Sequence, residues 1–109
     1  MKVALVWNGD RSSALAYSNV KQKFDISFLI TFLANGKSDL RVLSILKRQS
    51  ENRGVPFFWA KMKTGHAEEY RETITELKKD YGIEGIVTNG NERLIENACD
   101  ATGMKVIIA

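Results

Sequence analysis

Short runs of apolar residues alternate with segments of helical periodicity along the whole of this chain. The apolar runs are rich in valine, isoleucine and phenylalanine, and each has the length of a buried strand rather than of a helix. Because a helix separates each strand from the next, the strands are expected to run parallel in one sheet covered on both faces. The sequence therefore predicts an α/β domain with a doubly wound, Rossmann-like, five-stranded sheet.

Turn and cap residues set the limits of these segments. Asn8-Gly9-Asp10 ends the first apolar run, and Ser12 or Ser13 is expected to cap the helix that follows. The expected strands are 2–7, 26–34, 57–62, 84–88 and 104–109, and the expected helices are 12–24, 39–53, 66–81 and 92–102. Asn35-Gly36-Lys37 is read as a turn and Asp39 as a cap. The inward helix faces are expected to carry Leu40, Leu43 and Leu46, and Tyr70, Ile74, Leu77 and Tyr81.

Length and composition narrow the class of protein. The 109 residues suit a single domain over 1–109, and no apolar run approaches the ~20 residues of a membrane span. No cleavable signal peptide is expected, and Cys99 as the sole cysteine agrees with a cytoplasmic protein. His66 is the sole histidine, so a Cys/His metal site is not expected. The net charge of +3 suits an anionic ligand, but the scattered basic residues do not support nucleic-acid binding.

The loop after the first strand is the expected ligand site. If that strand is central, residues 7–13 lie at the switch point of the sheet, where such folds bind ligands. Gly9 permits close approach of a ligand to the backbone, and the N–H groups around Ser12 and Ser13 begin a helix and attract anions. Arg11 adds a cation suited to phosphate. The alternative is a capped turn without a ligand, in which Gly9 makes the bend and Arg11 is solvated.

The same loop resembles the pyrophosphatase loop of the N-type ATP pyrophosphatases. It is most similar to the diphthine–ammonia ligase (diphthamide synthase) branch, whose members carry S-G-G-K-D-S after a short strand. Asn8-Gly9-Asp10-Arg11-Ser12-Ser13 falls on those six positions, with the first Gly and the last Ser matched. Ala14-Leu15-Ala16 then matches the family's x-L-A.

The resemblance continues in order along the chain. Q-S-E-N-R-G-V-P at 49–56 is similar to the family's Q-A-E-x-x-G-I-P, and G-I-E-G-I-V-T at 82–88 is similar to G-I-E-G-V-V-T-G. I-E-N-A-C at 95–99 and T-G-M-K-V at 102–106 resemble I-E-x-x-C and L-G-L-K-V. The likeness thus covers nearly the whole chain, although no single motif is specific.

The resemblance implies an adenine nucleotide alpha hydrolase-like fold that binds ATP or AMP with Mg²⁺. It also implies ATP-dependent activation of a carboxyl group with release of pyrophosphate, with Arg11 as the candidate catalytic cation. On this basis Asn8, Gly9, Asp10, Arg11, Ser12 and Ser13 are expected to bind the nucleotide phosphates, joined by Thr88 and Gly90 at the end of the fourth strand. Asn89-Gly90 can equally be a plain turn dipeptide.

Several positions depart from the family pattern. Asp10 stands where the family has Gly, Arg11 replaces Lys, and Ser12 replaces Asp. The family insertions at 35–38 and 89–91 are shortened, and the family's C-terminal domain, which helps to form the substrate site, is not found before Ala109. We therefore expect the nucleotide half alone, with a partner protein or a second copy supplying the missing half. The alternative function is a non-catalytic nucleotide sensor or protein-interaction module with a decayed loop.

The remaining chemistry-bearing residues have simpler expected roles. Trp7 and Trp59 are expected in the core, His66 in solvent, and Cys99 as a buried, unreactive thiol. The acidic residues of the third helix are expected to form a solvated face without chemistry: Glu68, Glu69, Glu72 and Glu76.

Overall fold

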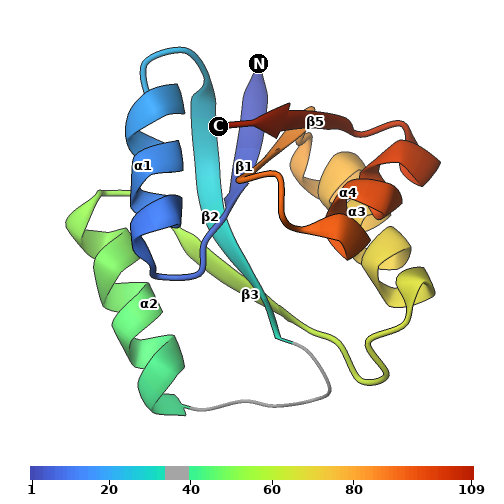
Figure 1. Ribbon diagram of the computed structural model, residues 1–109, viewed down its shortest axis with the longest axis horizontal. Helices are drawn as coiled ribbons and strands as arrows, with labels where there is room; N and C mark the ends of the chain where they lie inside the picture. The colour runs from blue at the N-terminus through green and yellow to red at the C-terminus, as the bar shows by residue number, and fades with distance from the viewer. Residues whose placement is uncertain (34–39) are drawn as a thin grey trace.

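The computed structural model describes residues 1–33 and 40–109 and confirms the α/β architecture (Figure 1). Helices and strands alternate as predicted: β1 (Lys2–Val6), α1 (Arg11–Val20), β2 (Asp25–Leu33), α2 (Leu40–Asn52), β3 (Phe57–Lys61), α3 (Ala67–Tyr81), β4 (Gly85–Thr88), α4 (Arg93–Thr102) and β5 (Lys105–Ile108). Three expected features lie outside the described residues: the strand end at Ala34, the Asn35-Gly36-Lys37 turn and the Asp39 cap.

The sheet has the predicted parallel, doubly wound topology. Its strand order is β3-β2-β1-β4-β5, and each neighbouring pair runs parallel. The chain moves outward from β1 through β2 to β3 and then crosses back to β4 on the other side of β1. Because β1 is central, its carboxyl end is the topological switch point, which meets the condition on which the sequence placed the ligand site there.

Each face of the sheet is covered by two helices, so the chain builds two apolar layers (Figure 1). The layer under α1 and α2 contains Val3, Leu5, Trp7, Ala16, Val20, Leu29, Leu46 and Val87. The layer under α3 and α4 is larger and includes Ala4, Val6, Phe28, Ile30, Met62, Tyr70, Ile74, Leu77, Ile86, Ile95 and Cys99. The alternation of β1 residues between the two layers follows from the period of two along a strand. Trp7 is 1% exposed, which confirms its predicted core position.

Three expected core positions are wrong. Trp59 is 54% exposed because β3 is an edge strand, and Leu40 is 78% exposed in the first turn of α2. Leu43 and Leu46 alone carry the inward face of that part of the helix. Tyr81 is 48% exposed at the end of α3, although its ring still meets Phe28 edge-on.

Polar groups inside the described part of the chain are satisfied. In residues 1–33 and 40–109, every buried side-chain nitrogen or oxygen has a hydrogen-bond partner. Helices in the same residues are too short or too polar to cross a lipid bilayer. The first helix ends at Val20 rather than near Phe24, and α4 begins at Arg93.

Candidate functional site

The loop between β1 and α1 is closed by its own side chains. Asp10, not Ser12 or Ser13, is the N-cap of α1, and its Oδ1 accepts a hydrogen bond from Ser13 N at 2.8 Å. The extended backbone of Asp10 (φ −100°, ψ 178°) directs its carboxylate over the first helical turn, which explains why the cap lies earlier than expected. The bond from the Ser13 N–H holds the pKa of Asp10 below its usual value.

Ser13 fixes the other side of this turn. Its side chain is buried, and its Oγ accepts a hydrogen bond from Asn8 N at 2.9 Å. Both the N–H and the hydroxyl of Ser13 are thus occupied within the loop, since the N–H goes to Asp10. Ser13, which the sequence predicts to bind phosphate, therefore uses both polar groups to hold the loop together.

Gly9 makes the bend, with φ of +75°. A Cβ at this position would lie 2.5 Å from Leu46 Cδ2 and 3.1 Å from Gln49 Oε1, so these two side chains of α2 would have to shift to admit it, in addition to the strain of the positive φ. Trp7 Nε1 donates to the same Gln49 Oε1 at 2.9 Å, and the Arg53 guanidinium lies 4.7 Å from the Trp7 ring. The loop is therefore fixed against α2.

Arg11 is the available cation of this loop. Its side chain is exposed at the first position of α1, and no acceptor for its guanidinium occurs in residues 1–33 or 40–109. The N–H groups of Arg11 and Ser12 also lack an acceptor in this part of the chain, whereas those of Ser13 and Ala14 bond to Asp10. A positive side chain and free donors thus coincide at the amino end of a helix.

A second loop, between β4 and α4, is ordered by Glu96. The Oε2 of Glu96 accepts from Thr88 Oγ1 at 2.8 Å and from Glu92 N at 3.1 Å. Thr88 Oγ1 in turn accepts from Gly90 N at 3.1 Å, and Gly90 has φ of +89°. The Thr88 hydroxyl, buried at 1% exposure, is engaged within its own loop. The sequence does not predict this role of Glu96.

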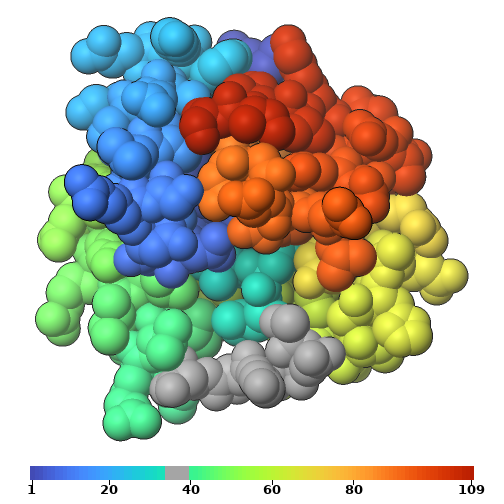
Figure 2. Space-filling view, viewed as in Figure 1, coloured from blue at the N-terminus to red at the C-terminus, as the bar shows by residue number. Residues whose placement is uncertain are grey.

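Hydrogen bonds join the two loops at the switch point. Asn8 Nδ2 donates to Glu92 Oε1 at 2.9 Å, across 84 positions in the sequence, and Asn89 Nδ2 donates to Ser12 Oγ at 3.1 Å. Figure 2 shows the blue first loop beside the orange segment that follows β4. The structure therefore brings the two sets of predicted site residues together.

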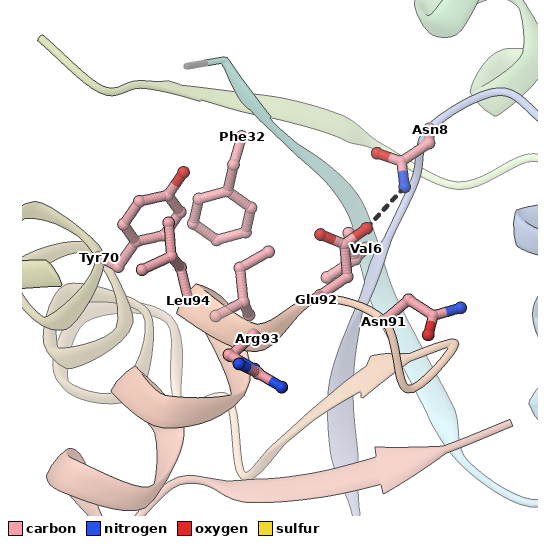
Figure 3. A pocket seen from close by; sticks show the side chains of 9 residues that line it. Val6, Asn8, Phe32, Tyr70, Asn91, Glu92, Arg93 and Leu94 are labelled. Carbon is pink, nitrogen blue, oxygen red and sulfur yellow. Dashed lines mark hydrogen bonds between the residues drawn. The ribbon is translucent and has the colours of Figure 1, made fainter. Parts of the chain in front are cut away.

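A cavity of about 400 Å³ opens beside these loops (Figure 3). Apolar and aromatic side chains form one wall, including Phe32 at the end of β2 and Tyr70 of α3, whose rings stack at 5.6 Å. Polar groups of Asn8, Asn91 and Glu92 line the other side. Burial, with the nearby charges of Glu92 and Glu69, raises the pKa of Tyr70, so its hydroxyl stays protonated.

The sequence does not predict the aromatic wall. It predicts Phe32 only as part of a strand and Tyr70 only on the inner face of a helix. The available signal was positional, because Phe32 lies near the carboxyl end of the strand next to β1. For Glu92 the sequence predicts only the start of a helix.

Other titratable side chains have structural positions. The Cys99 thiol is buried, which, with Asp100 and Glu96 nearby, raises its pKa to about 12, and His66 is exposed, as expected. Glu69 is not simply solvated: its carboxylate accepts from the N–H groups of Lys63, Thr64 and Gly65. These bonds and one from the Thr64 hydroxyl, the largest contribution, lower the pKa of Glu69 to about 2.

Comparison with known proteins supports the fold and gives the family. A chain from Methanocaldococcus jannaschii, described as a predicted subunit of tRNA methyltransferase, aligns with 99% of this chain and 67% of its own length. The TM-score is 0.57 at 11% sequence identity, which establishes a shared fold. Among curated protein sequences there is no significant match.

The family model of the diphthamide synthase N-terminal domain matches residues 1–106. This match includes both loops of the switch point and the aromatic wall of the cavity. It confirms the resemblance to the ATP pyrophosphatases of the PP-loop superfamily. The chain therefore belongs to the family of diphthamide synthase N-terminal domains.

Proposed function

We propose that this domain binds an adenine nucleotide at the switch point of its sheet. The observation that carries the proposal is the cavity of about 400 Å³ beside the β1–α1 and β4–α4 loops. Its position outside the carboxyl ends of parallel strands is where open α/β sheets bind ligands. Membership of an ATP pyrophosphatase-like family gives the ligand class.

The two ends of the site suit the two ends of a nucleotide. The stacked rings of Phe32 and Tyr70 offer an apolar surface for the base, and Asn8, Asn91 and Glu92 offer donors and acceptors beside it. Arg11 and the first N–H groups of α1 suit the phosphates. The nucleotide would thus run from the aromatic wall toward the start of α1.

Mg²⁺ fits this site only when it is bound together with the nucleotide phosphates. The described residues contain no group of three or more His, Cys, Asp or Glu side chains placed to hold a metal. Protein-bound Mg²⁺ commonly takes one or two carboxylates and completes its shell with phosphate oxygens and water. Asp10 is the carboxylate nearest to the start of α1, and Mg²⁺, when bound, would reduce repulsion between that charge and the phosphates.

Catalysis by this domain alone is disfavoured. Adenylation needs strong stabilisation of charge on the α-phosphoryl group, and Arg11 is the single cation that the loop supplies for it. We propose that ATP-dependent carboxyl activation with pyrophosphate release requires cationic groups beyond those of this loop, supplied by a partner protein or a second copy. The test is pyrophosphate release from ATP by the chain alone and with candidate partners.

A second function, a nucleotide sensor without chemistry, is favoured by the Asp10 cap. Its carboxylate occupies the Ser13 N–H that a phosphate would otherwise use. Such a sensor binds AMP or ATP without releasing pyrophosphate. Both functions therefore use the same binding site, and they differ in whether ATP is converted with release of pyrophosphate.

Nuclear magnetic resonance tests the shared binding site. Titration with ATP, AMP and, as the matched control, GTP should shift amide signals of residues 8–13 and 91–95 with the adenine nucleotides. Phe32→Ala should weaken AMP binding, because the base loses its stacking surface, while Tyr17→Ala on α1, away from the cavity wall, should not. Shifts confined to other residues, or equal responses to GTP and ATP, contradict the proposed site.

A further inference from the structure

The edge strand β3 takes no part in the proposed nucleotide site. It stands at the end of the sheet, and no strand of residues 1–33 or 40–109 pairs with its outer side. Trp59 and Phe58 are 54% and 37% exposed on it. Hollows flank the strand on both faces of the sheet, one beside Leu77 and Tyr81 of α3 and the other beside Leu40 and Leu43 of α2.

The backbone of β3 has a definite free edge. Pro56 O accepts from Leu29 N and Met62 N donates to Leu33 O, so the even-numbered residues turn their backbone groups toward β2. Alternation along the strand then leaves the N–H and C=O groups of Phe57, Trp59 and Lys61 pointing outward. Pro56 has no N–H, but an N–H at this position would point inward toward β2. Pro56 therefore does not block pairing at the outer edge.

We propose that two copies of this chain pair through β3, antiparallel, about a two-fold axis beside Trp59. In an antiparallel ladder, residues that exchange both backbone hydrogen bonds alternate with residues that exchange none. Because the backbone groups of Trp59 point outward, Trp59 lies opposite Trp59 of the other copy, and the two residues exchange both backbone hydrogen bonds. The next pair that exchanges hydrogen bonds is Phe57 with Lys61 of the other copy. The outward set is thus self-complementary, as a two-fold contact requires, and joins the two sheets into one.

The side chains of β3 match in the same register. On the α2 face, this register places the two Trp59 side chains opposite each other at the axis and Lys61 opposite Phe57 of the second copy. Within one chain, the rings of Phe57 and Trp59 stack at 6.2 Å. On the α3 face, Phe58, which packs edge-on against Phe28, comes opposite the small Ala60. A large residue therefore faces a small one, and a cation faces an aromatic ring.

The pairing of β3 does not depend on nucleotide binding. A second copy suits this edge because the side-chain pairs that the two-fold register creates are complementary, Lys61 with Phe57 and Phe58 with Ala60. The edge at β5 offers an internal control, since Ile108 is 61% exposed there. A shared edge at β3 keeps both switch-point loops accessible, because they leave the carboxyl ends of β1 and β4.

Sedimentation of the 109-residue chain over a range of concentrations tests the pairing. We expect a mass approaching twice 12.3 kDa at millimolar chain, and reversible dissociation on dilution. Trp59→Lys and Trp59→Glu should each be monomeric, because like charges then meet at the axis, whereas Ile108→Lys should remain dimeric. An equimolar mixture of the two Trp59 variants should recover the doubled mass.

Amide hydrogen exchange gives a second readout. The outward N–H groups of Phe57, Trp59 and Lys61 should be protected in the dimer and exchange at least tenfold faster in Trp59→Lys, while the inward N–H groups of Phe58 and Ala60 change little. A chain that stays at 12.3 kDa at millimolar concentration overturns the proposal. So does a dimer that survives both Trp59 variants or is lost with Ile108→Lys.

Discussion

The carboxylate of Asp10 lies 2.8 Å from the backbone N of Ser13 and so occupies one of the first N–H groups of α1. An anion supplied by the chain itself thus sits where the amino end of a helix attracts phosphate. Arg11, the next residue, has no such internal partner in the described part of the chain. The strength of phosphate binding therefore depends on the balance between an internal carboxylate and a neighbouring cation.

Asp10→Asn should strengthen nucleotide binding. Asparagine is as good an N-cap as aspartate, so the fold is kept while one negative charge is removed. A charge about 5 Å from a phosphate costs roughly 1–3 kcal/mol at effective dielectrics of about 80 down to 20, which corresponds to about 5- to 150-fold in Kd. Calorimetric titration with AMP measures the change.

The control for this variant is Asp25→Asn, which removes the same charge at the amino end of β2, the opposite end of the sheet. It should leave Kd unchanged. Equal affinity in Asp10→Asn and the unmodified chain would mean that phosphate does not approach the Asp10 carboxylate.

Gly9→Ala should destabilise the fold. The residue would adopt φ of +75° with its Cβ 2.5 Å from Leu46 Cδ2, so backbone strain and a clash act together. We expect a loss of roughly 2–5 kcal/mol in the free energy of unfolding, measured with urea. Gly54→Ala is the matched control, because Gly54 has φ of +70° and open space around it.

For Gly54→Ala only the backbone strain of the positive φ should remain, and the free energy of unfolding should fall by about 1–2 kcal/mol. Equal losses for the two variants would show that the close approach to α2 does not constrain the loop.

Glu69→Gln should remove an acid-sensitive part of the stability. The folded pKa of Glu69, about 2, lies below its ordinary 4.5 because its carboxylate accepts the Thr64 hydroxyl and three backbone N–H bonds. A lowered folded pKa gives stability that is present above pH 4.5 and lost as the pH falls toward 2. The Tm of the variant should therefore be lower at neutral pH and converge with the unmodified chain at pH 2.

Glu72→Gln, on the exposed side of the same helix, serves as the control. Its Tm should follow that of the unmodified chain at every pH. A constant Tm difference between Glu69→Gln and the unmodified chain down to pH 2 would contradict the assigned role of the ionised carboxylate.

The sequence predicted most of the fold because apolar periodicity and glycine positions act locally. The parallel direction of the strands followed from the alternation of helices and strands, whereas the central place of β1, on which the expected switch point depended, is given by the structure. Trp59 was misplaced because composition does not reveal that β3 is an edge strand. The burial of a strand depends on its neighbours in the sheet, which are set by tertiary structure.

For the candidate site, the sequence predicted the two loops that meet at the switch point. Residues 8–13 and 88–90 stand out because turn residues mark the ends of strands, and the structure joins their loops through Asn8, Ser12 and Asn89. Asp10 was not recognised as the cap, since Ser and Asp are equally suitable and only the backbone angles decide between them. Phe32 and Tyr70 were missed because their stacking joins two distant elements.

Thermal unfolding with Mg²⁺ and ATP or AMP tests nucleotide binding most directly. At about 100 times Kd, a ligand of the native state adds about 2.7 kcal/mol, which should raise Tm by roughly 10–20 °C for a domain of this size. The shift should largely disappear in Arg11→Ala and persist in Arg48→Ala, which removes an exposed arginine from α2. No shift at millimolar nucleotide, or an equal shift in both variants, would contradict phosphate binding at the start of α1.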